Sequence, residues 1–317
     1  MTRAALRIGT RASALALWQA RHIRALIAAL PGAPTIELVP ITTSGDLQTQ
    51  VPLWTVQGRA FFTKELDRAL LEDRIDLAVH SLKDLPTELE PGLALAAVLE
   101  REDPRDALVS QDGRTLTALS AGARVGTSSL RRRAFIARLR PDIHLHELRG
   151  NVPTRLERLE HGDYDAIVLA AAGLKRLGLE SRITERLGPA DFPPAVSQGA
   201  IGVCAREGDA ATACWLEPLD HAATRLATTA ERSLLRRIEG GCQVPLGALA
   251  RLEAGSIHMR AVVCTLEGTR SLSAEGSAPA DAGAARDLGE RLAEELLAQG
   301  AAQLIAAQRA AQEAPEP

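Results

Sequence analysis

Two stretches of this sequence repeat one local pattern, and the repeat limits the folds that the chain can adopt. Arg7-Ile-Gly-Thr-Arg-Ala-Ser13 and Arg124-Val-Gly-Thr-Ser-Ser129 each predict a short strand, a Gly-Thr turn and the start of a helix. In both copies a later helix leads into an apolar strand opened by aspartate, Asp76-Leu-Ala-Val79 or Asp165-Ala-Ile-Val168. Two βα units can resemble each other by chance, but we interpret the repeat as two similar α/β lobes around a cleft.

Two proline-containing segments indicate where the chain crosses between the lobes, Arg101-Glu-Asp-Pro-Arg-Asp106 and Phe192-Pro-Pro-Ala-Val-Ser-Gln-Gly199. The apolar stretch 200–204 would then return the chain to the first lobe's sheet. Beyond residue 218 the pattern changes to a long helix, three strands joined by turns, and one final helical run over 282–311. We therefore predict the following domains: a first α/β lobe (1–100 and 199–218), a second α/β lobe (101–198), and a smaller α+β C-terminal domain with a three-stranded antiparallel sheet (219–317).

Composition excludes several classes of protein. Apolar residues make up 46% and charged residues 24% of the 317 residues, which is typical of a soluble globular protein. The longest apolar block, 166–174, is too short to span a membrane, and the N-terminus lacks the apolar core of a signal peptide, so we expect a cytoplasmic protein. A net charge of −3 and 3% aromatic residues argue against a nucleic-acid partner. The cysteines show no metal-ligand spacing, so we expect no metal.

The strand Leu77–Val79 ends abruptly in polar residues. His80, Ser81, Lys83 and Asp84 follow it, before Leu85-Pro86 stops regular structure. Ligands of α/β proteins bind at the carboxyl ends of strands, so Asp84 would face the contents of the cleft, although an ordinary turn also explains it. In the second copy the equivalent positions are Ala172 and Gly173, so only the first lobe carries this acid.

Arginines gather at the strand ends of both predicted lobes. The only lysines are Lys64, Lys83 and Lys175, so composition weakens any single arginine as evidence and makes each lysine more informative. Backbone amides, hydroxyls and guanidiniums together suit carboxylate or phosphate, which favours a polyanionic small molecule. A solvated basic face and an RNA-binding arginine run over 131–140 remain alternatives. The residues concerned are Arg11, Ser13, Thr127, Ser128, Ser129, Arg131, Arg132, Arg133, Arg149, Arg155 and Arg176.

Cys242 differs from the other three cysteines. Cys204 and Cys264 lie in apolar strand patterns and Cys214 lies in a predicted helix, which is typical of inert packing. Cys242 instead follows two glycines, in a loop that allows another group to approach closely. It could be a nucleophile, an attachment point or an unmodified loop thiol.

Several of these motifs, in this order, resemble the porphobilinogen deaminase family, also called hydroxymethylbilane synthase. The resemblance runs from residue 6 to about residue 250, and the last 60 or so residues match only in general character. The matching pieces are Arg7-Ile-Gly-Thr-Arg-Ala-Ser13, Ala78-Val-His-Ser-Leu-Lys-Asp-Leu-Pro86, Glu102-Asp-Pro-Arg-Asp106, Val125-Gly-Thr-Ser-Ser-Leu-Arg-Arg132, Leu148-Arg-Gly-Asn-Val152, Ala172-Gly-Leu-Lys-Arg-Leu177, Gln198-Gly-Ala200 and Glu239-Gly-Gly-Cys-Gln-Val-Pro245.

The resemblance implies three domains, the first two built like periplasmic binding proteins. It implies a dipyrromethane cofactor joined by a thioether to Cys242. On this primer, four porphobilinogen molecules would condense head to tail, each releasing ammonia, and hydrolysis would then free hydroxymethylbilane for porphyrin and heme biosynthesis. A monomer is implied as well. The acetate and propionate groups of the pyrroles would be the polyanion that the arginines require.

The resemblance also implies roles for matching residues. Asp84 would assist loss of the amino group and stabilise the resulting cation, and Lys83 would favour the ionised form of nearby acids. The cofactor would be bound by Cys242, Lys83, Asp84, Ser13, Thr127, Ser128, Ser129, Arg131, Arg132, Arg155 and Gly173. The substrate would be bound by Arg11, Gln19, Phe62, Arg149, Arg155 and Arg176.

Two departures from the family pattern stand out. A predicted mobile loop over 42–60 leads into Arg59-Ala-Phe-Phe62 where the family often has Lys-Gly-Leu-Phe, which leaves loop closure open. The family's Val-Gly-Gln-Gly is Val196-Ser-Gln-Gly199. The main alternative function is a non-catalytic, two-lobed binding protein for an organic polyanion.

Overall fold

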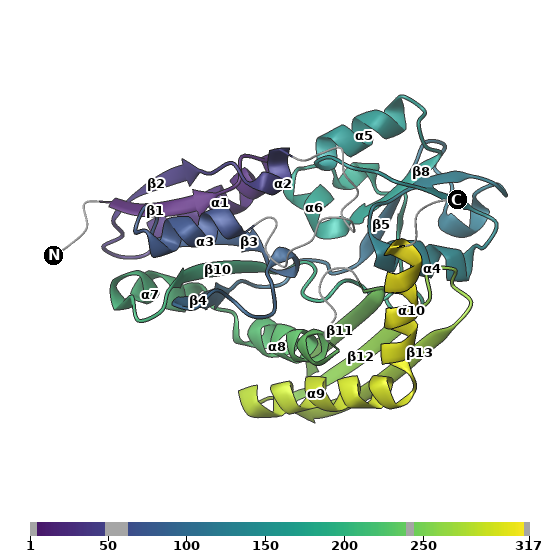
Figure 1. Cartoon of the computed structure of the whole chain (residues 1–317). Coiled ribbons are helices and arrows are strands. Elements are labelled where there is room, and N and C mark those ends of the chain that lie inside the picture. Colours follow the sequence, from purple (N-terminus) through teal and green to yellow (C-terminus); the bar gives the residue numbers. More distant parts are fainter. Residues whose placement is uncertain (1–4, 48–62, 239–243, 314–317) are drawn as a thin grey trace.

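Figure 1 shows two α/β lobes and a third, separate sheet with its own helices. It is a computed structural model, and it describes residues 5–47, 63–238 and 244–313. Within these ranges the strands form two five-stranded mixed sheets and one three-stranded antiparallel sheet. This is the predicted fold class. No helix in the same ranges has the length and hydropathy needed to cross a membrane.

The first sheet has the strand order β2-β1-β3-β10-β4. β1 is parallel to β2 and β3, whereas β10 is antiparallel to both of its neighbours. Successive β3 residues alternate between two cores, because Leu77 and Val79 pack with α1 while Ala78 packs with α3. The elements are β1 (Ala5–Thr10), α1 (Ala14–Ala28), β2 (Thr35–Pro40), α2 (Ser44–Leu47), α3 (Lys64–Leu71), β3 (Leu77–Ser81), η2 (Leu82–Asp84), β4 (Leu93–Val98), β10 (Ile201–Arg206), α7 (Ala210–Leu216) and η5 (Glu217–Leu219).

The second sheet repeats this plan in the order β7-β6-β8-β5-β9. β6 is parallel to β7 and β8, and β5 is antiparallel to β8 and β9. The predicted repeat is therefore confirmed at the level of strand order. The elements are β5 (Asp106–Ser110), η3 (Leu116–Ala118), β6 (Arg124–Gly126), α4 (Leu130–Leu139), β7 (His144–His146), α5 (Val152–Glu160), β8 (Ala166–Ala170), α6 (Ala171–Arg176), η4 (Glu180–Arg182) and β9 (Glu185–Arg186).

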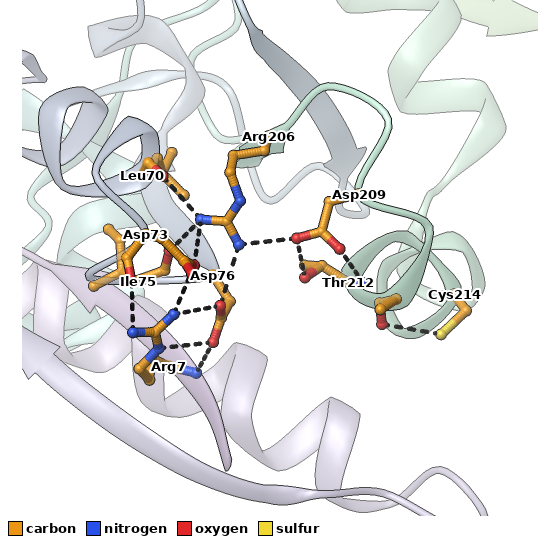
Figure 2. Close-up of polar contacts among 10 residues, drawn as sticks. Arg7, Leu70, Asp73, Ile75, Asp76, Arg206, Asp209, Thr212 and Cys214 are labelled. Carbon is orange, nitrogen blue, oxygen red and sulfur yellow. Dashed lines mark hydrogen bonds and ion pairs between the residues drawn. The ribbon is translucent and has the colours of Figure 1, made fainter. Parts of the chain in front are cut away.

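The repeat extends to an arginine–aspartate pair between neighbouring strands. The backbone N–H and the guanidinium of Arg7 both donate to Asp76, and those of Arg124 donate in the same way to Asp165. Figure 2 shows that Asp76 also accepts a hydrogen bond from Arg206, the last residue of β10. The Asp76 side chain is fully buried, whereas that of Asp165 is 41% exposed. The pair of the first lobe thus has a second arginine, and its aspartate is shielded from water.

Two antiparallel segments carry the chain between the lobes. The first ends where β5 begins in the second sheet, and the second leads into β10, which pairs within the first sheet as predicted. The N–H of Glu102 donates to Gly199 O at 3.2 Å, so the segments touch. Gly199 has φ +92°, and a side chain there would collide with the Glu102 carbonyl. Ser197 also takes a left-handed φ of 63°, an uncommon conformation for a residue other than glycine.

The third sheet has the strand order β11-β12-β13, and its two faces contribute to different hydrophobic cores. Val263 lies in one core with its own helices, while Val262 and Cys264 join the core of the second lobe. The predicted single helix over 282–311 is wrong, because Gly300, with φ +102°, separates two helices. The elements are α8 (Ala222–Arg237), β11 (Leu246–Glu253), β12 (Ser256–Cys264), β13 (Ser271–Pro279), α9 (Ala282–Ala298) and α10 (Ala301–Glu313).

Candidate active site

The segment after β3 is held by apolar residues on either side of its polar pair. Leu82 and Leu85 are buried, and Lys83 and Asp84 between them are partly exposed. Arg232 of α8 donates to the carbonyls of Leu85 and Pro86. The C-terminal domain therefore fixes the backbone immediately after the predicted catalytic acid.

Lys83 reaches from the first lobe toward the second crossing segment. Its Nζ donates to Oε1 of Gln198 at 3.2 Å. Burial lowers the pKa of Lys83 to about 8, Asp84 opposes this decrease, and Arg132 adds to it. This lysine consequently titrates close to neutral pH.

Asp106 is the partner of two arginines that we predicted to bind the cofactor. The distances from Nη2 of Arg131 and of Arg132 to the Asp106 carboxylate are 2.8 and 2.7 Å. Burial raises the pKa of Asp106, but Arg131 and Arg132 outweigh it and hold that pKa below its usual range. Remaining guanidinium N–H groups donate to Val168 O and Pro193 O. The two guanidiniums are thus buried against a carboxylate of the protein.

Arg149 and Arg155 flank the start of α5. Asn151 caps this helix by accepting from Thr154 N, and Nε of Arg155 donates to Gly150 O at 2.7 Å. Burial lowers the pKa of Arg155 to about 10, Arg132 and Arg149 lower it further, and the opposite charge of Asp84 resists the change. Burial also lowers the pKa of Arg149. Cations of the second lobe and the acid of the first are therefore within electrostatic reach of one another.

The predicted hydroxyl residues shape the turns at the strand ends. Ser13 caps α1 by accepting from Ala16 N, and Ser129 caps α4 by accepting from Arg132 N. Thr127 accepts from Ser129 N, and Ser128 donates to Leu148 O. A hydroxyl that accepts in a cap still has its own proton to donate, so capping and anion binding are compatible.

The remaining predicted residues lie on helices of both lobes. Gln19 is buried in α1 and donates to Ser81 Oγ at 2.9 Å. Arg176 donates to Gly199 O and lies 5.9 Å from the Trp18 ring centroid, and burial lowers its pKa to about 10. A Cβ on Gly173 would lie 3.7 Å from Leu15 Cδ2, which places α6 against α1.

Arg11, at the turn between β1 and α1, acts on His80 of β3. Burial lowers the pKa of His80 to about 4, and the charge of Arg11 adds to this decrease. The imidazole is therefore neutral near neutral pH. Cys242, Phe62 and the departure at 59–62 lie outside the described residues.

Sequence reasoning missed several polar residues of this site. Asp106 is the last residue of the first crossing motif and Gln198 the next-to-last of the second, so the signal was their place in segments that we interpret as linkers. Ser81 was noted as a polar residue at the strand end, but its hydrogen bond from Gln19 was not foreseen. Glu147, whose charged neighbours include Arg149 and Arg155, is partly buried, and burial raises its pKa. Its position just after β7 was the available signal.

Two family models match the chain. The model described as "Porphobilinogen deaminase, dipyromethane cofactor binding domain" matches residues 6–214, and "Porphobilinogen deaminase, C-terminal domain" matches residues 225–298. The chain belongs to the porphobilinogen deaminase family. As a member, it is a transferase of porphyrin biosynthesis that acts on porphobilinogen and uses a dipyrromethane cofactor.

Solved structures of binding proteins show a distant likeness to this porphobilinogen deaminase family member. A YaeC-family lipoprotein from Enterococcus faecalis is 12% identical with a TM-score of 0.41, over 68% of this chain and 91% of that chain. A probable amino-acid ABC transporter extracellular-binding protein from Bacillus subtilis gives 12% and 0.41, over 68% and 89%. The periplasmic aliphatic sulphonate binding protein of Escherichia coli gives 16% and 0.38, over 74% and 70%.

Proposed function

We propose that Asp84 is the catalytic acid of a stepwise, head-to-tail condensation of four porphobilinogen molecules. In each step the substrate loses its amino group as ammonia and becomes a cation. The Asp84 carboxyl group can give a proton to the leaving amine, and its carboxylate then neutralises the cation that remains. Lys83 is its neighbour in the sequence, and the positive charge of Lys83 stabilises the carboxylate that remains after the proton has been given.

The observation that carries the proposal is the approach of one acid to a group of cations from the other lobe. The pKa values of Lys83 and Arg155 both respond to Asp84 and to Arg132. Like charges this close repel each other, and a bound polyanion relieves the repulsion. Pyrrole acetates and propionates supply such charge.

The same cations fit the dipyrromethane cofactor, because its carboxylates need donors that remain positive. When bound, the cofactor supplies the primer that accepts the first substrate unit. Arg149 and Arg155 would hold its carboxylates or those of the substrate, and Ser13 and Ser129 would donate hydroxyl protons. We further propose that Cys242 forms the thioether and that hydrolysis ends the cycle. We retain the predicted domain limits and the cleft between the lobes as part of this proposal.

The decisive test is Asp84→Asn in the holoenzyme, with Asp287→Asn as the control. Asp287 is an exposed aspartate on α9. We expect Asp84→Asn to keep its cofactor mass and thermal unfolding midpoint, while ammonia release falls at least about 100-fold. Asp287→Asn should behave like the parent protein. Near-normal ammonia release by Asp84→Asn would remove the acid from the mechanism.

Intact-protein mass tests the attachment point independently. The parent protein should carry the added mass of two linked pyrroles, and Cys242→Ser should show the bare sequence mass. Cys214→Ser is the control, since Cys214 is exposed on α7. Retention of the addition by Cys242→Ser would place the bond elsewhere.

A further inference from the structure

Gln198 in the second crossing segment is almost completely buried, with 1% of its surface exposed. Its Nε2 donates to Pro104 O at 2.8 Å and to Asp106 Oδ1 at 3.1 Å. Its Oε1 accepts from Lys83 Nζ at 3.2 Å. A flipped amide would set its oxygen against the carboxylate and its NH₂ against the ammonium, so these neighbours allow a single orientation.

The contacts of Gln198 join groups from both lobes. Lys83 belongs to η2 beside the first sheet, whereas Asp106 begins β5 of the second sheet. Asp106 in turn holds Arg131 and Arg132. A neutral side chain thus separates the lysine from a carboxylate that already has two cationic partners.

We infer that Gln198 is a positioning residue for the reaction, which orients Lys83 beside Asp84 and couples it through Asp106 to the arginine pair of the second lobe. The inference rests on the function proposed above for Lys83 and Asp84. Gln198 lies in the second of the two crossing segments, which together form the hinge between the lobes. A change in the relative position of the lobes would therefore alter the hydrogen bonding of the Lys83 ammonium. The position of the second lobe would thereby affect the charged group next to the proposed catalytic acid.

A glutamine suits this position better than a carboxylate or an apolar residue. A carboxylate would bind Lys83 more strongly but would face the like charge of Asp106. An apolar side chain of equal length would leave both the Lys83 ammonium and Asp106 short of one hydrogen bond. The charged groups that act on Lys83 are Asp84 of η2, Asp106 of β5, and Arg131 and Arg132 of α4.

The test compares Gln198→Met, Gln198→Glu and Lys83→Arg with Gln111→Met, as purified holoenzymes, by kcat/KM against pH and by thermal unfolding. Gln111 is the control because its amide also makes a long-range hydrogen bond, to Leu159 O, within the second lobe. We expect kcat/KM of the parent protein to decline above about pH 8, because Lys83 then loses its proton. Lys83→Arg should abolish this alkaline decline, since arginine does not titrate there.

Opposite effects of the two Gln198 variants would support the inference. Gln198→Met should lower kcat/KM at neutral pH by roughly tenfold and move the alkaline decline to lower pH, because the ammonium loses an acceptor. Gln198→Glu should move the decline to higher pH, because a carboxylate then faces Lys83. Gln111→Met should lose stability without any change in the pH profile.

A decline at an unchanged pH in both Gln198 variants would overturn the inference, even if both unfold at lower temperature, and Gln198 would then be a structural residue of the hinge. Persistence of the decline in Lys83→Arg would overturn it too. The Asp84→Asn result separates these failures from failure of the proposed function. An inactive Asp84→Asn with unshifted Gln198 profiles removes the coupling alone, whereas an active one removes the catalytic assignment itself.

Discussion

Lys83 illustrates at the level of one residue how burial of a charged group can cost stability. Its ordinary pKa of 10.5 falls to about 8 in the folded protein, chiefly through burial. Below pH 8 the chain must therefore fold around a charge that water would solvate better. The protein keeps the ammonium beside Asp84 at the expense of its free energy of unfolding.

This cost predicts that Lys83→Met is less active but more stable at pH 7, by about 1 to 3 kcal/mol. Between the folded pKa of about 8 and the unfolded value of 10.5, the unfolded parent chain binds a proton that the folded one has lost. The free energy of unfolding of the parent therefore rises with pH in that window, and the advantage of the variant shrinks.

Urea unfolding of both proteins at pH 7 and pH 10 measures this difference. Lys175→Met is the control, since Lys175 is exposed and pairs with Glu102. If Lys83→Met is no more stable than its parent at pH 7, the ammonium is well solvated in the fold.

The place of Asp84 at the end of a strand was predictable from sequence, but the partners of the arginines were not. A buried apolar strand that ends in polar residues indicates a site at the strand end, and Lys83 and Asp84 lie there. The run from Arg131 to Arg133 predicts a helix start but contains no sign of which side chains turn inward. Their partner Asp106 lies about 25 residues earlier, where the first crossing segment meets β5, and it contacts them only in the folded protein.

At the level of elements, both lobes contain an arginine–aspartate pair that joins neighbouring strands. In the first lobe Arg7 and Arg206 enclose a fully buried Asp76 (Figure 2). In the second, Arg124 and Asp165 are 45% and 41% exposed. The geometry is the same, but the first pair is shielded from water and the second is not.

Burial therefore predicts unequal costs for the same substitution in the two copies. Asp76→Asn removes the buried carboxylate that Arg7 and Arg206 share, although exposed Asp73 still pairs with both and Asp209 with Arg206. The substitution should lower the free energy of unfolding by about 2 to 3 kcal/mol. Asp165→Asn should lower it far less, because solvent screens the exposed pair. Urea unfolding of the two variants at neutral pH and at high salt measures both costs, and equal losses would contradict the argument.

Sequence patterns predicted the order of elements better than their ends. The repeat and the return of β10 to the first sheet followed from apolar strands at matching places in the chain. The break between α9 and α10 was missed because strong helix formers surround Gly300. Its left-handed φ ends the helix there, and a glycine inside a long helical pattern was the signal to weigh.

At the level of the whole molecule, Glu231 of α8 links the third sheet to both crossing segments between the lobes. Its buried carboxylate accepts from Arg101 of the first crossing and from the N–H of Ser197 in the second. It also accepts from the N–H of Ala250 in β11. One side chain of the C-terminal domain thus holds both crossing segments, and it does so at Ser197, whose backbone has a left-handed conformation.

Glu231→Gln should therefore destabilise the protein by about 3 kcal/mol, because Arg101 loses its buried counter-charge and at least one acceptor becomes a donor. Glu290→Gln is the matched control, since Glu290 pairs with Arg236 at an exposed position. Urea unfolding monitored by tryptophan fluorescence gives both values. A loss no larger than that of the control would show that the hinge does not depend on this carboxylate.

The path of β10 has a consequence for synthesis on the ribosome. β10 lies between β3 and β4 and is hydrogen-bonded to both, yet it follows the whole second sheet in the sequence. Until residue 206 leaves the exit tunnel, β3 and β4 present unpaired edges, which are prone to pair with other chains. The second sheet draws only on residues 106–186 and can be complete by then. The part of the nascent protein that emerges first is therefore the part that needs protection longest.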